Sequence, residues 1–256
     1  MLARHQKILE LLADKEDLSV KDLSEKLNVT GATVRTDLNI LAKADKIERV
    51  HGGAHIKEGR TRQEYTFQVR KSLNANKKEK IGRAASNLVS PFDSIILDSS
   101  STVLALAHAL RLREDLTEIT VIPTGIWTAI EMMGCENINV LLPGGYLRHA
   151  SGSITGLPTT GFLNDILIQK AFLGALGISV KNGVSDTHLL EVELKKYIVN
   201  KAKEVIILID GSKFNQTGLA TFAGIKQIST IITDTSAPKS EIEKIKKSGV
   251  KVIIAK

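Results

Sequence analysis

The chain has 256 residues, of which 43% are hydrophobic, so it is long enough to bury one large core or two modest ones. Its formal net charge of +7 and pI near 9.4 suit a polyanionic partner, although a mild excess of lysine is also typical of a plain solvated surface. The single cysteine, Cys135, excludes an intrachain disulfide, and the lack of ~20 uninterrupted apolar residues excludes a membrane span, so we expect a soluble cytoplasmic protein.

Residues 1–57 predict three helices followed by a hairpin. The apolar residues of the stretch 8–12 mark the first helix, whose regular charges are unlike the apolar core of a signal peptide. Ser19, followed three residues later by Asp22, is typical of a capping box at the start of the second helix. Leu23 and Leu27 lie on one face of that helix.

The third helix begins after Thr30, a residue that can cap it, and carries two different faces. Val34, Leu38 and Leu41 recur at i, i+4 and i+7, the spacing of one buried stripe. The chain then changes to "KIERVHGGAHI", in which the pair Gly52-Gly53 separates two short extended runs and predicts a hairpin turn. Together these elements predict a winged helix-turn-helix, with the helix-turn-helix motif at about residues 20–39.

In such a motif the third helix enters the major groove of double-stranded DNA, where the base edges differ in their donors and acceptors. Small side chains occupy the start of the helix. Hydrogen-bond donors lie further along its outer face and on the wing, and Lys46 lies near the wing. The candidate DNA-binding residues are Thr30, Ala32, Thr33, Arg35, Thr36, Asn39, Arg49 and His51. The alternative is a three-helix protein-interaction module whose polar face is only solvated.

Residues 58–80 are rich in lysine and arginine and poor in acids, so we expect a basic linker. Such a linker can contact phosphates that flank an operator, or serve only as a solvated connector. Tyr65 and Phe67 are candidates for fixing it to the body of the protein.

From residue 81 to residue 256, short apolar runs alternate with helical stretches, which predicts a mostly parallel, Rossmann-like α/β domain with helices on both faces of the sheet. The predicted strands are residues 94–98, 119–123, 138–142, 171–176, 205–210, 230–234 and 250–255. The predicted helices are residues 102–110, 126–133, 189–203 and 240–247.

Ligands of parallel sheets bind at the carboxyl ends of the strands, and polar loops follow four of these strands. The first loop, "DSSST", leads directly into a helix, and its hydroxyl and backbone N–H groups suit a phosphate group. Taken singly, such a loop is a helix cap and a Gly-Gly pair is a turn. Taken together, the loops predict a site for a phosphorylated small molecule, against the alternative of an unoccupied sheet edge. The candidate effector-binding residues are Asp98, Ser99, Ser100, Ser101, Thr102, Thr124, Gly144, Gly145, Arg148, Asp210 and Lys213.

The stretch "VTGATVRTDL" followed by "RVHGGA" resembles the head of the DeoR-type bacterial transcriptional regulators, whose usual pattern is V-S-x-x-T-[IV]-R-R-D-L and then R-x-H-G-G-A. Thr30 replaces the usual serine and conserves a cap, whereas Thr36 replaces a second arginine and removes one charged contact. "NANKKEKIGRAA" resembles the end of the family's linker, and most of the remaining chain is similar to its sensor domain.

The resemblance implies a repressor of a sugar-utilisation operon, whose sensor domain is similar to ribose-5-phosphate isomerase. It implies that Ser99–Thr102 hold the phosphate group, that Asp210 and Lys213 face sugar hydroxyls, and that the pocket is lined by Thr124, Gly144, Gly145 and Arg148. Ser100, Gly125 and Gln169 depart from the usual glycine, asparagine and aspartate, so we expect an altered effector preference. We also expect a homo-oligomer, dimer or tetramer, with residues 126–133 or 189–199 as candidate contacts.

The competing hypothesis is a sugar-phosphate isomerase that carries a DNA-binding head. Isomerisation needs a general base and a group that stabilises the enediolate, and Gly174–Ser179 offers no second carboxylate beside Asp210. We therefore expect no enzyme activity. The six histidines lack metal-ligand spacing, and the loops lack the phosphate-loop and dinucleotide patterns, so we expect no metal and no cofactor.

Overall fold

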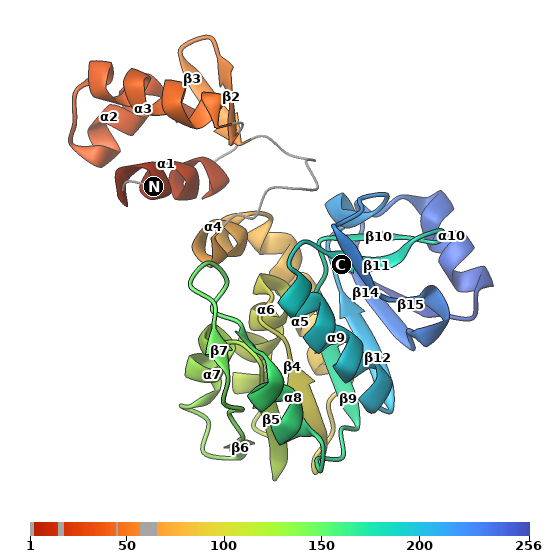
Figure 1. The fold of residues 1–256 in the computed structure, drawn as a ribbon. Helices are drawn as coiled ribbons and strands as arrows, with labels where there is room; N and C mark the ends of the chain where they lie inside the picture. The colour runs from red at the N-terminus through yellow and green to blue at the C-terminus, as the bar shows by residue number, and fades with distance from the viewer. Residues whose placement is uncertain (1–2, 15–17, 45, 57–65) are drawn as a thin grey trace. The chain divides into compact units, whose positions relative to one another are not determined.

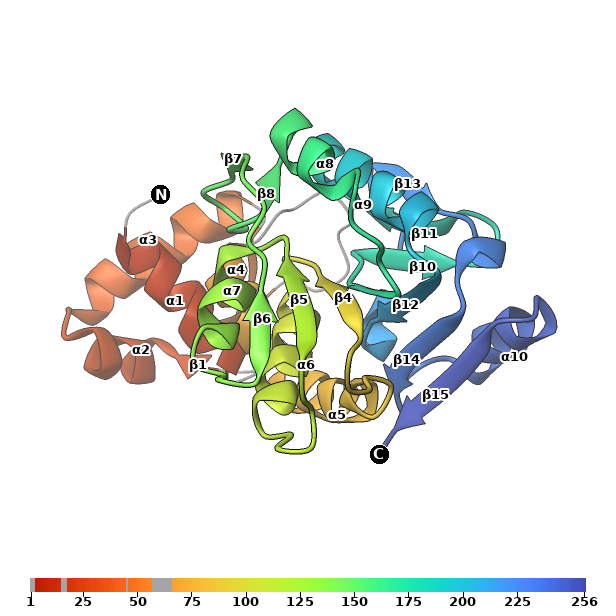
Figure 2. The same cartoon turned by 90° about the horizontal axis from the view of Figure 1, so that it is seen from below.

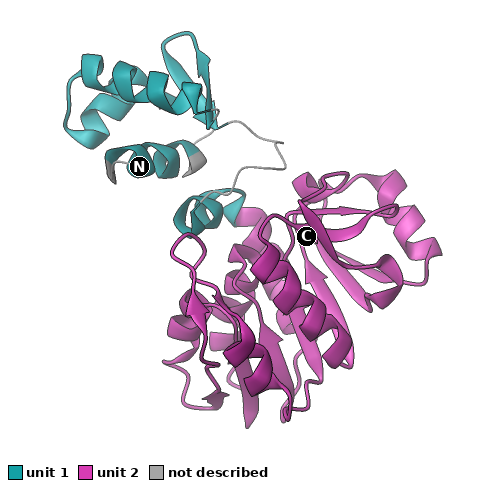
Figure 3. Cartoon of the chain, in the orientation of Figure 1, with its two compact units in different colours: residues 1–75 teal, residues 76–256 magenta. Residues whose placement is uncertain are grey.

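The computed structural model describes residues 3–14, 18–44, 46–56 and 66–256. The chain forms two compact units, residues 1–75 and residues 76–256 (Figure 3). Residues 57–65, which include the first part of the predicted linker and Tyr65, lie outside the described residues. None of the helices within the described ranges is both long and apolar enough to cross a membrane.

The first unit is a winged helix-turn-helix, as predicted (Figure 1). Its helices are α1 (Ala3–Asp14), α2 (Val20–Leu27), α3 (Gly31–Lys43) and α4 (Phe67–Ser72). Its strands are β1 (Leu18–Ser19), β2 (Ile47–Val50) and β3 (Gly53–Ile56), which form an antiparallel sheet in the order β1-β3-β2. Two elements, β1 and α4, were not expected; α4 packs beside α1, and its Val69 belongs to the core of this unit.

The core of the first unit follows the predicted spacing. The stripe of Val34, Leu38 and Leu41 on α3 is buried against apolar residues of α1, α2 and the sheet. The capping box at α2 is confirmed, because Ser19 Oγ accepts from the Asp22 backbone N–H at 3.1 Å and Asp22 Oδ2 accepts from the Ser19 N–H at 3.0 Å. Thr30 Oγ1 caps α3 by accepting from the Thr33 N–H at 3.2 Å.

The wing turn lies one residue earlier than predicted. Val50 pairs with Gly53, so the turn consists of His51 and Gly52, and Gly53 already belongs to β3. The two glycines serve different purposes. Gly52 has a φ of +82°, which favours glycine, whereas a Cβ on Gly53 would lie 2.3 Å from the carbonyl oxygen of Leu18 on β1. The unexpected strand β1 is therefore the reason for the second glycine.

The second unit is built on a parallel sheet of seven strands in the order β15-β14-β12-β9-β4-β5-β6. All seven predicted strands are confirmed, with ends shifted by a few residues. They are β4 (Ser94–Leu97), β5 (Ile119–Pro123), β6 (Ile138–Val140), β9 (Lys170–Leu173), β12 (Glu204–Leu208), β14 (Thr230–Asp234) and β15 (Lys251–Ala255).

Helices cover both faces of this sheet; Figure 2 shows α5 and α6 on one side and α8 and α9 on the other. The helices are α5 (Ala75–Ser86), α6 (Ser101–Arg111), α7 (Ile126–Met132), α8 (Leu157–Leu163), α9 (Leu189–Lys201) and α10 (Lys239–Lys247). Two short 3-10 helices follow strands, η1 (Gly211–Lys213) and η2 (Ile225–Gln227). The α/β fold of the C-terminal part is therefore confirmed.

Short antiparallel strands beside the main sheet escaped prediction. They are the hairpin β7 (Tyr146–Leu147) and β8 (Ile154–Thr155), and a three-stranded sheet of β10 (Gly177–Ser179), β11 (Gly183–Asp186) and β13 (Ala220–Ala223). Strands of two to four residues contain too few positions for an alternating pattern to be recognised. Both additions lie next to polar residues of the candidate effector site.

Candidate nucleic-acid interface and effector site

The outer face of α3 is open to solvent at the predicted positions. Ala32, Arg35, Thr36 and Asn39 are exposed, as is the capping residue Thr30, and Thr33 is half-buried. The hydroxyl of Thr36 donates to the Ala32 carbonyl oxygen at 3.1 Å, so it is held against its own helix. The face thus combines a slim start with the long donor Arg35, a combination that suits the floor of a DNA major groove.

The wing and α3 meet through Arg49. Its guanidinium donates to Asn39 Oδ1 at 2.6 Å and to the Gly53 carbonyl oxygen at 3.2 Å. His51 is exposed in the wing turn, while His55 contacts Glu48 at 3.1 Å. The structure therefore brings the candidates of the wing and of the helix together on one surface of the first unit.

A buried charge cluster behind this surface was missed by sequence reasoning. Asp37 lies on the inner side of α3, where it accepts hydrogen bonds from the Arg4 guanidinium at 2.5 and 3.0 Å and contacts His5 Nε2 at 3.0 Å. The hydrogen bond from Arg4 lowers the pKa of Asp37, and this outweighs the opposite effect of burial. The cluster ties α3 to α1 and so fixes the orientation of the outer face of α3.

At the carboxyl end of β4, the loop "DSSST" is built around Asp98. Asp98 is 1% exposed, and its Oδ1 accepts from the Ser100 backbone N–H at 2.8 Å. Ser100 Oγ in turn caps α6 by accepting from the Val103 N–H at 3.1 Å. One predicted alternative, the helix cap, thus applies to Ser100, while Ser99, Ser101 and Thr102 place further buried hydroxyls at the start of the same helix.

The ends of β5 and β9 lie directly against this loop. Thr124, at the end of β5, is buried, and its N–H donates to the Leu97 carbonyl oxygen at 2.9 Å. A Cβ on Gly125 would lie 2.7 Å from Ser99 Cα, and a Cβ on Gly174 would lie 2.3 Å from Ser100 Oγ. The glycine that replaces the usual asparagine at position 125 is therefore required by the close approach of two loops in this chain.

Gly144, Gly145 and Arg148 belong to the segment that leads from β6 into the β7–β8 hairpin. Gly144 and Gly145 are exposed, and the Gly144 carbonyl oxygen accepts from Thr159 Oγ1 at 2.8 Å. Arg148, which we expected to pair with a ligand anion, is buried and donates to Glu191 Oε1 at 2.5 Å. An anion that engaged Arg148 would have to compete with this carboxylate.

Asp210 and Lys213 lie at the same sheet edge but two strands away from β4, because β9 separates β4 from β12. Asp210 is buried and caps η1 by accepting from the Ser212 N–H at 3.0 Å, and Lys213 is half-buried. Nearby, Asp234 accepts from the Gly211 N–H at 2.7 Å. Burial raises the pKa of Asp234, but hydrogen bonds from Ser236 and Gly211 outweigh it and leave the pKa lowered.

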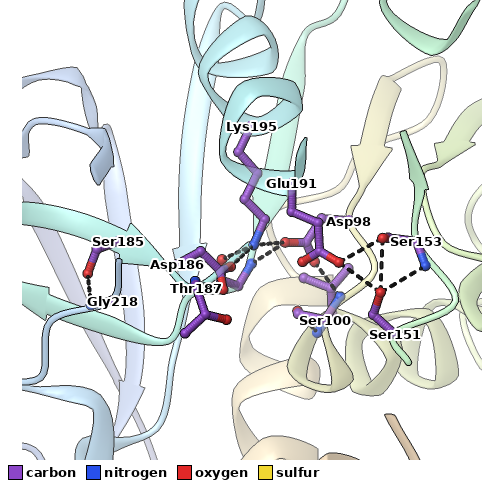
Figure 4. A network of polar contacts seen from close by, with 12 residues as sticks. Asp98, Ser100, Ser151, Ser153, Ser185, Asp186, Thr187, Glu191, Lys195 and Gly218 are labelled. Carbon is purple, nitrogen blue, oxygen red and sulfur yellow. Dashed lines mark hydrogen bonds and ion pairs between the residues drawn. The ribbon is translucent and has the colours of Figure 1, made fainter. Parts of the chain in front are cut away.

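A second charged cluster, also missed, surrounds Asp98 (Figure 4). Lys195 of α9 is buried, and its ammonium lies 2.7 Å from Asp186 Oδ2, 2.9 Å from the Gly174 carbonyl oxygen and 3.2 Å from Asp98 Oδ2. Burial lowers the pKa of Lys195, but the carboxylates of Asp186, Asp98 and Glu191 outweigh this effect and raise it. Lys195 therefore carries a positive charge between the ends of three strands.

Glu191, one turn before Lys195 on α9, connects this cluster to the hairpin (Figure 4). Its Oε1 accepts from Ser151 Oγ at 2.8 Å and from Ser153 Oγ at 2.7 Å, in addition to Arg148. Ser153 forms an antiparallel β-bridge with Gly125, and Gly125 lies directly against Ser99 of the loop. Gly174–Ser179 itself carries no acid, as expected, but Asp186 of β11 and Glu191 of α9 bring two further carboxylates close to the loop, and sequence reasoning named neither.

Family models match nearly the whole chain. The model of the DeoR-like helix-turn-helix domain matches residues 4–60, and the model of the DeoR C-terminal sensor domain matches residues 73–235. The chain belongs to the DeoR family. It is thus a helix-turn-helix transcriptional regulator, as the two motifs of its head predict.

Two DeoR-family relatives are similar over almost their entire length. The transcriptional regulator GolR of Listeria innocua is 33% identical over 98% of this chain and 98% of its own. The putative aga operon transcriptional repressor of Escherichia coli O157:H7 is 31% identical over 98% of this chain and 93% of its own. Among solved structures, ribose 5-phosphate isomerase A from Methanocaldococcus jannaschii is 23% identical, with a TM-score of 0.42 over 55% of each chain.

The signals for the missed residues of this DeoR-family chain were weak for a physical reason. Glu191 and Lys195 stand four residues apart on a helix, which is also the spacing of an ordinary surface ion pair. Asp37 stands among polar residues of α3, and only the position of α1 shows that it is buried. An acid on the same side of the helix as the apolar stripe is the one local sign that was available.

Proposed function

We propose that this DeoR-family regulator represses a sugar-utilisation operon and that a phosphorylated sugar, bound in the second unit, controls its affinity for operator DNA. The observation that carries the proposal is the loop of residues 98–102. It presents buried hydroxyls at the start of α6, with the ends of β5 and β9 packed against it. Backbone N–H groups at a helix start, together with hydroxyls, suit a phosphoryl group.

The surroundings of the loop favour a ligand with hydroxyl groups beside the phosphoryl group. Asp210 and Lys213 lie along the same sheet edge, and Glu191 already accepts hydrogen bonds from two serine hydroxyls. Carboxylates of this kind accept hydrogen bonds from sugar hydroxyls, and a lysine ammonium donates hydrogen bonds to them. A further relative, the glycerol-3-phosphate regulon repressor of Escherichia coli K12, is 28% identical over 94% of this chain and 93% of its own, and its name agrees with a small phosphorylated effector.

In the first unit we propose that Arg35 and its neighbours on α3 contact base edges, while Thr30 and the wing residues Arg49 and His51 contact the backbone of the DNA. The effector would bind more tightly to an arrangement of the two units that does not suit the operator. Operator binding then lowers the affinity for the effector by the same factor as effector binding lowers the affinity for the operator. The coupling free energy is typically about 1–3 kcal/mol. Because the proposed operator is part of the chromosome, the protein would act in the compartment that holds the chromosome.

The proposed site is tested with a panel of sugar phosphates in a thermal-shift measurement. We expect at least one compound to raise the Tm, because a ligand at about 100 times its Kd adds roughly 2.7 kcal/mol to the stability of the native state. Ser101→Ala should abolish most of this shift and leave operator binding without effector within about twofold of wild type. The matched control is Ser240→Ala, which removes an exposed hydroxyl of α10. Equal shifts in both variants and wild type would place the effector elsewhere.

One observation favours a second candidate, a sugar-phosphate isomerase: Asp98, Asp186 and Glu191 put three carboxylates around the loop. Each of them, however, already has a cationic or hydroxyl partner, whereas a general base must be able to receive a proton from the substrate. We therefore expect no conversion of ribose 5-phosphate on incubation with the protein. If the protein did convert ribose 5-phosphate, and Glu191→Gln abolished this activity, the isomerase function would be favoured.

A further inference from the structure

Lys195 contacts the ends of the strands that surround the proposed effector site (Figure 4). An ammonium group has three hydrogen atoms to donate, and three oxygen atoms lie within reach of it. They belong to Asp186, to the Gly174 carbonyl group and to Asp98, at 2.7, 2.9 and 3.2 Å. The ammonium is thus directed at oxygen atoms of the protein, so Lys195 holds these groups in place and does not itself contact a ligand.

Asp98, which contacts Lys195, also accepts hydrogen bonds from the backbone of the loop and from that of Gly174. Its Oδ1 accepts from the Ser100 N–H, and its Oδ2 accepts from the Gly174 N–H, both at 2.8 Å. Ser100 is the cap of α6, and Gly174 packs against it closely enough to leave no room for a side chain. One carboxylate therefore sets the positions of two backbone segments that are more than seventy residues apart in the sequence.

The charge of Asp98 is unfavourable for the proposed ligand unless it is compensated. A buried carboxylate next to a phosphoryl group repels it, and in a site with little water this repulsion is weakly screened. Lys195 supplies the compensating charge from α9, at a distance where it also pairs with Asp186. The ammonium also lies 5.1 Å from the centre of the Phe222 ring, within the range of a cation–π interaction.

We propose that Lys195 is the positioning residue of the effector site. Through Asp98 and the Gly174 carbonyl group, it holds residues 98–101 and Gly174 in the arrangement that receives a phosphoryl group. The inference rests on the proposed function for the identity of the ligand. The positioning itself exists without a ligand and can be measured without one.

The first test is amide hydrogen exchange on the full-length protein without ligand. In Lys195→Met we expect peptides that contain Ser100 and Gly174 to exchange about tenfold faster or more, because their N–H groups lose a fixed acceptor. Lys196→Met, the same change at the exposed neighbouring position of α9, should leave them unchanged, and Lys195→Arg should restore most of the protection. Unchanged exchange at Ser100 and Gly174 in Lys195→Met would overturn the proposal, as would an equal increase throughout residues 76–256.

The second test is a double-mutant cycle with ribose 5-phosphate, or the best ligand of the panel, measured by calorimetry. Lys195→Met and Asp98→Asn should each weaken binding by about tenfold, and the double variant should bind no more weakly than the weaker single variant. Additive losses would show that Lys195 does not act through Asp98. If no sugar phosphate binds wild type, but Lys195→Met raises exchange only around Ser100 and Gly174, then the proposed function fails and the positioning role stands.

Discussion

At the scale of single residues, the two units use buried charges in the same manner. Asp37 in the first unit and Asp98 in the second are almost fully buried, and each accepts hydrogen bonds from groups on other elements. A buried carboxylate is expensive unless it is paired, so each one selects the positions of its partners. In both cases the carboxylate holds a segment to which we assign a proposed function, α3 or the serine loop, in place.

We predict that Asp37→Asn destabilises the first unit by roughly 1–3 kcal/mol near neutral pH, because Arg4 and His5 lose a charged acceptor. The pKa of Asp37 is lowered in the folded protein, so its stabilising effect is present above the unfolded value of about 4 and is lost as the pH falls through the folded value. Thermal unfolding at pH 7 and at pH 3 measures this. The difference between wild type and the variant should shrink at pH 3, and a difference that is constant with pH would contradict the role of the charge.

At the scale of elements, α3 has to serve the core and the groove at once. Its buried stripe fixes it to α1 and α2, and in the proposed DNA-binding role this attachment would hold Arg35, on the opposite side, in a defined register with the bases. Thr36, where relatives of this type usually carry a second arginine, donates to its own helix. We therefore propose that base reading by this helix depends more strongly on Arg35 than it does in the usual pattern.

Arg35→Ala should weaken operator binding by about 1–3 kcal/mol and reduce the discrimination between operator and unrelated DNA. The control is Lys251→Ala, which removes the same charge from an exposed position of β15 in the second unit. Electrophoretic mobility or fluorescence anisotropy at a fixed salt concentration measures both. If the two variants lose the same small amount of affinity for every DNA, Arg35 contributes only net charge and α3 is not the reader.

At the scale of the whole molecule, symmetric operators require more than one copy of the reading helix, and we propose at least a dimer. The predicted contact region at residues 126–133 now has a specific surface. On α7 and at its end, Ile130 is 54% exposed and Met133 is 77% exposed, next to the edge strand β6 of the sheet. Residues 189–199, the other candidate, bury Val192, Leu194 and Ile198 within their own unit, and their exposed apolar side chains, Leu189 and Leu190, are confined to the start of α9.

We expect Ile130→Glu combined with Met133→Glu to lower the molar mass in light scattering toward that of a single chain. Operator affinity should fall by about tenfold or more, because two linked heads bind far more tightly than one. Leu219→Glu, a similar change at an exposed leucine before β13, is the control. A wild-type protein that is monomeric at the concentrations of operator binding would contradict the proposal, and an unchanged mass of the double variant would move the contact to another surface.

The sequence by itself determined the elements whose information is local. The spacing of Val34, Leu38 and Leu41, the caps Ser19 and Thr30, and the seven apolar runs of the parallel sheet depend on neighbours within a few residues. The loops at the carboxyl edge could also be located, because the order of strands and helices in an α/β sheet brings these loops to one side.

Only the tertiary structure decided which charged groups meet. Arg148 pairs with Glu191 across 43 residues, Arg4 with Asp37 across 33, and the Gly174 N–H with Asp98 across 76. No periodicity of helix or strand extends over such distances. The sequence alone does not distinguish a helical lysine or glutamate that faces water from one that faces a buried charged group. The identity of the serine loop could therefore be predicted, whereas the residues that hold it in shape became visible only once the chain was folded.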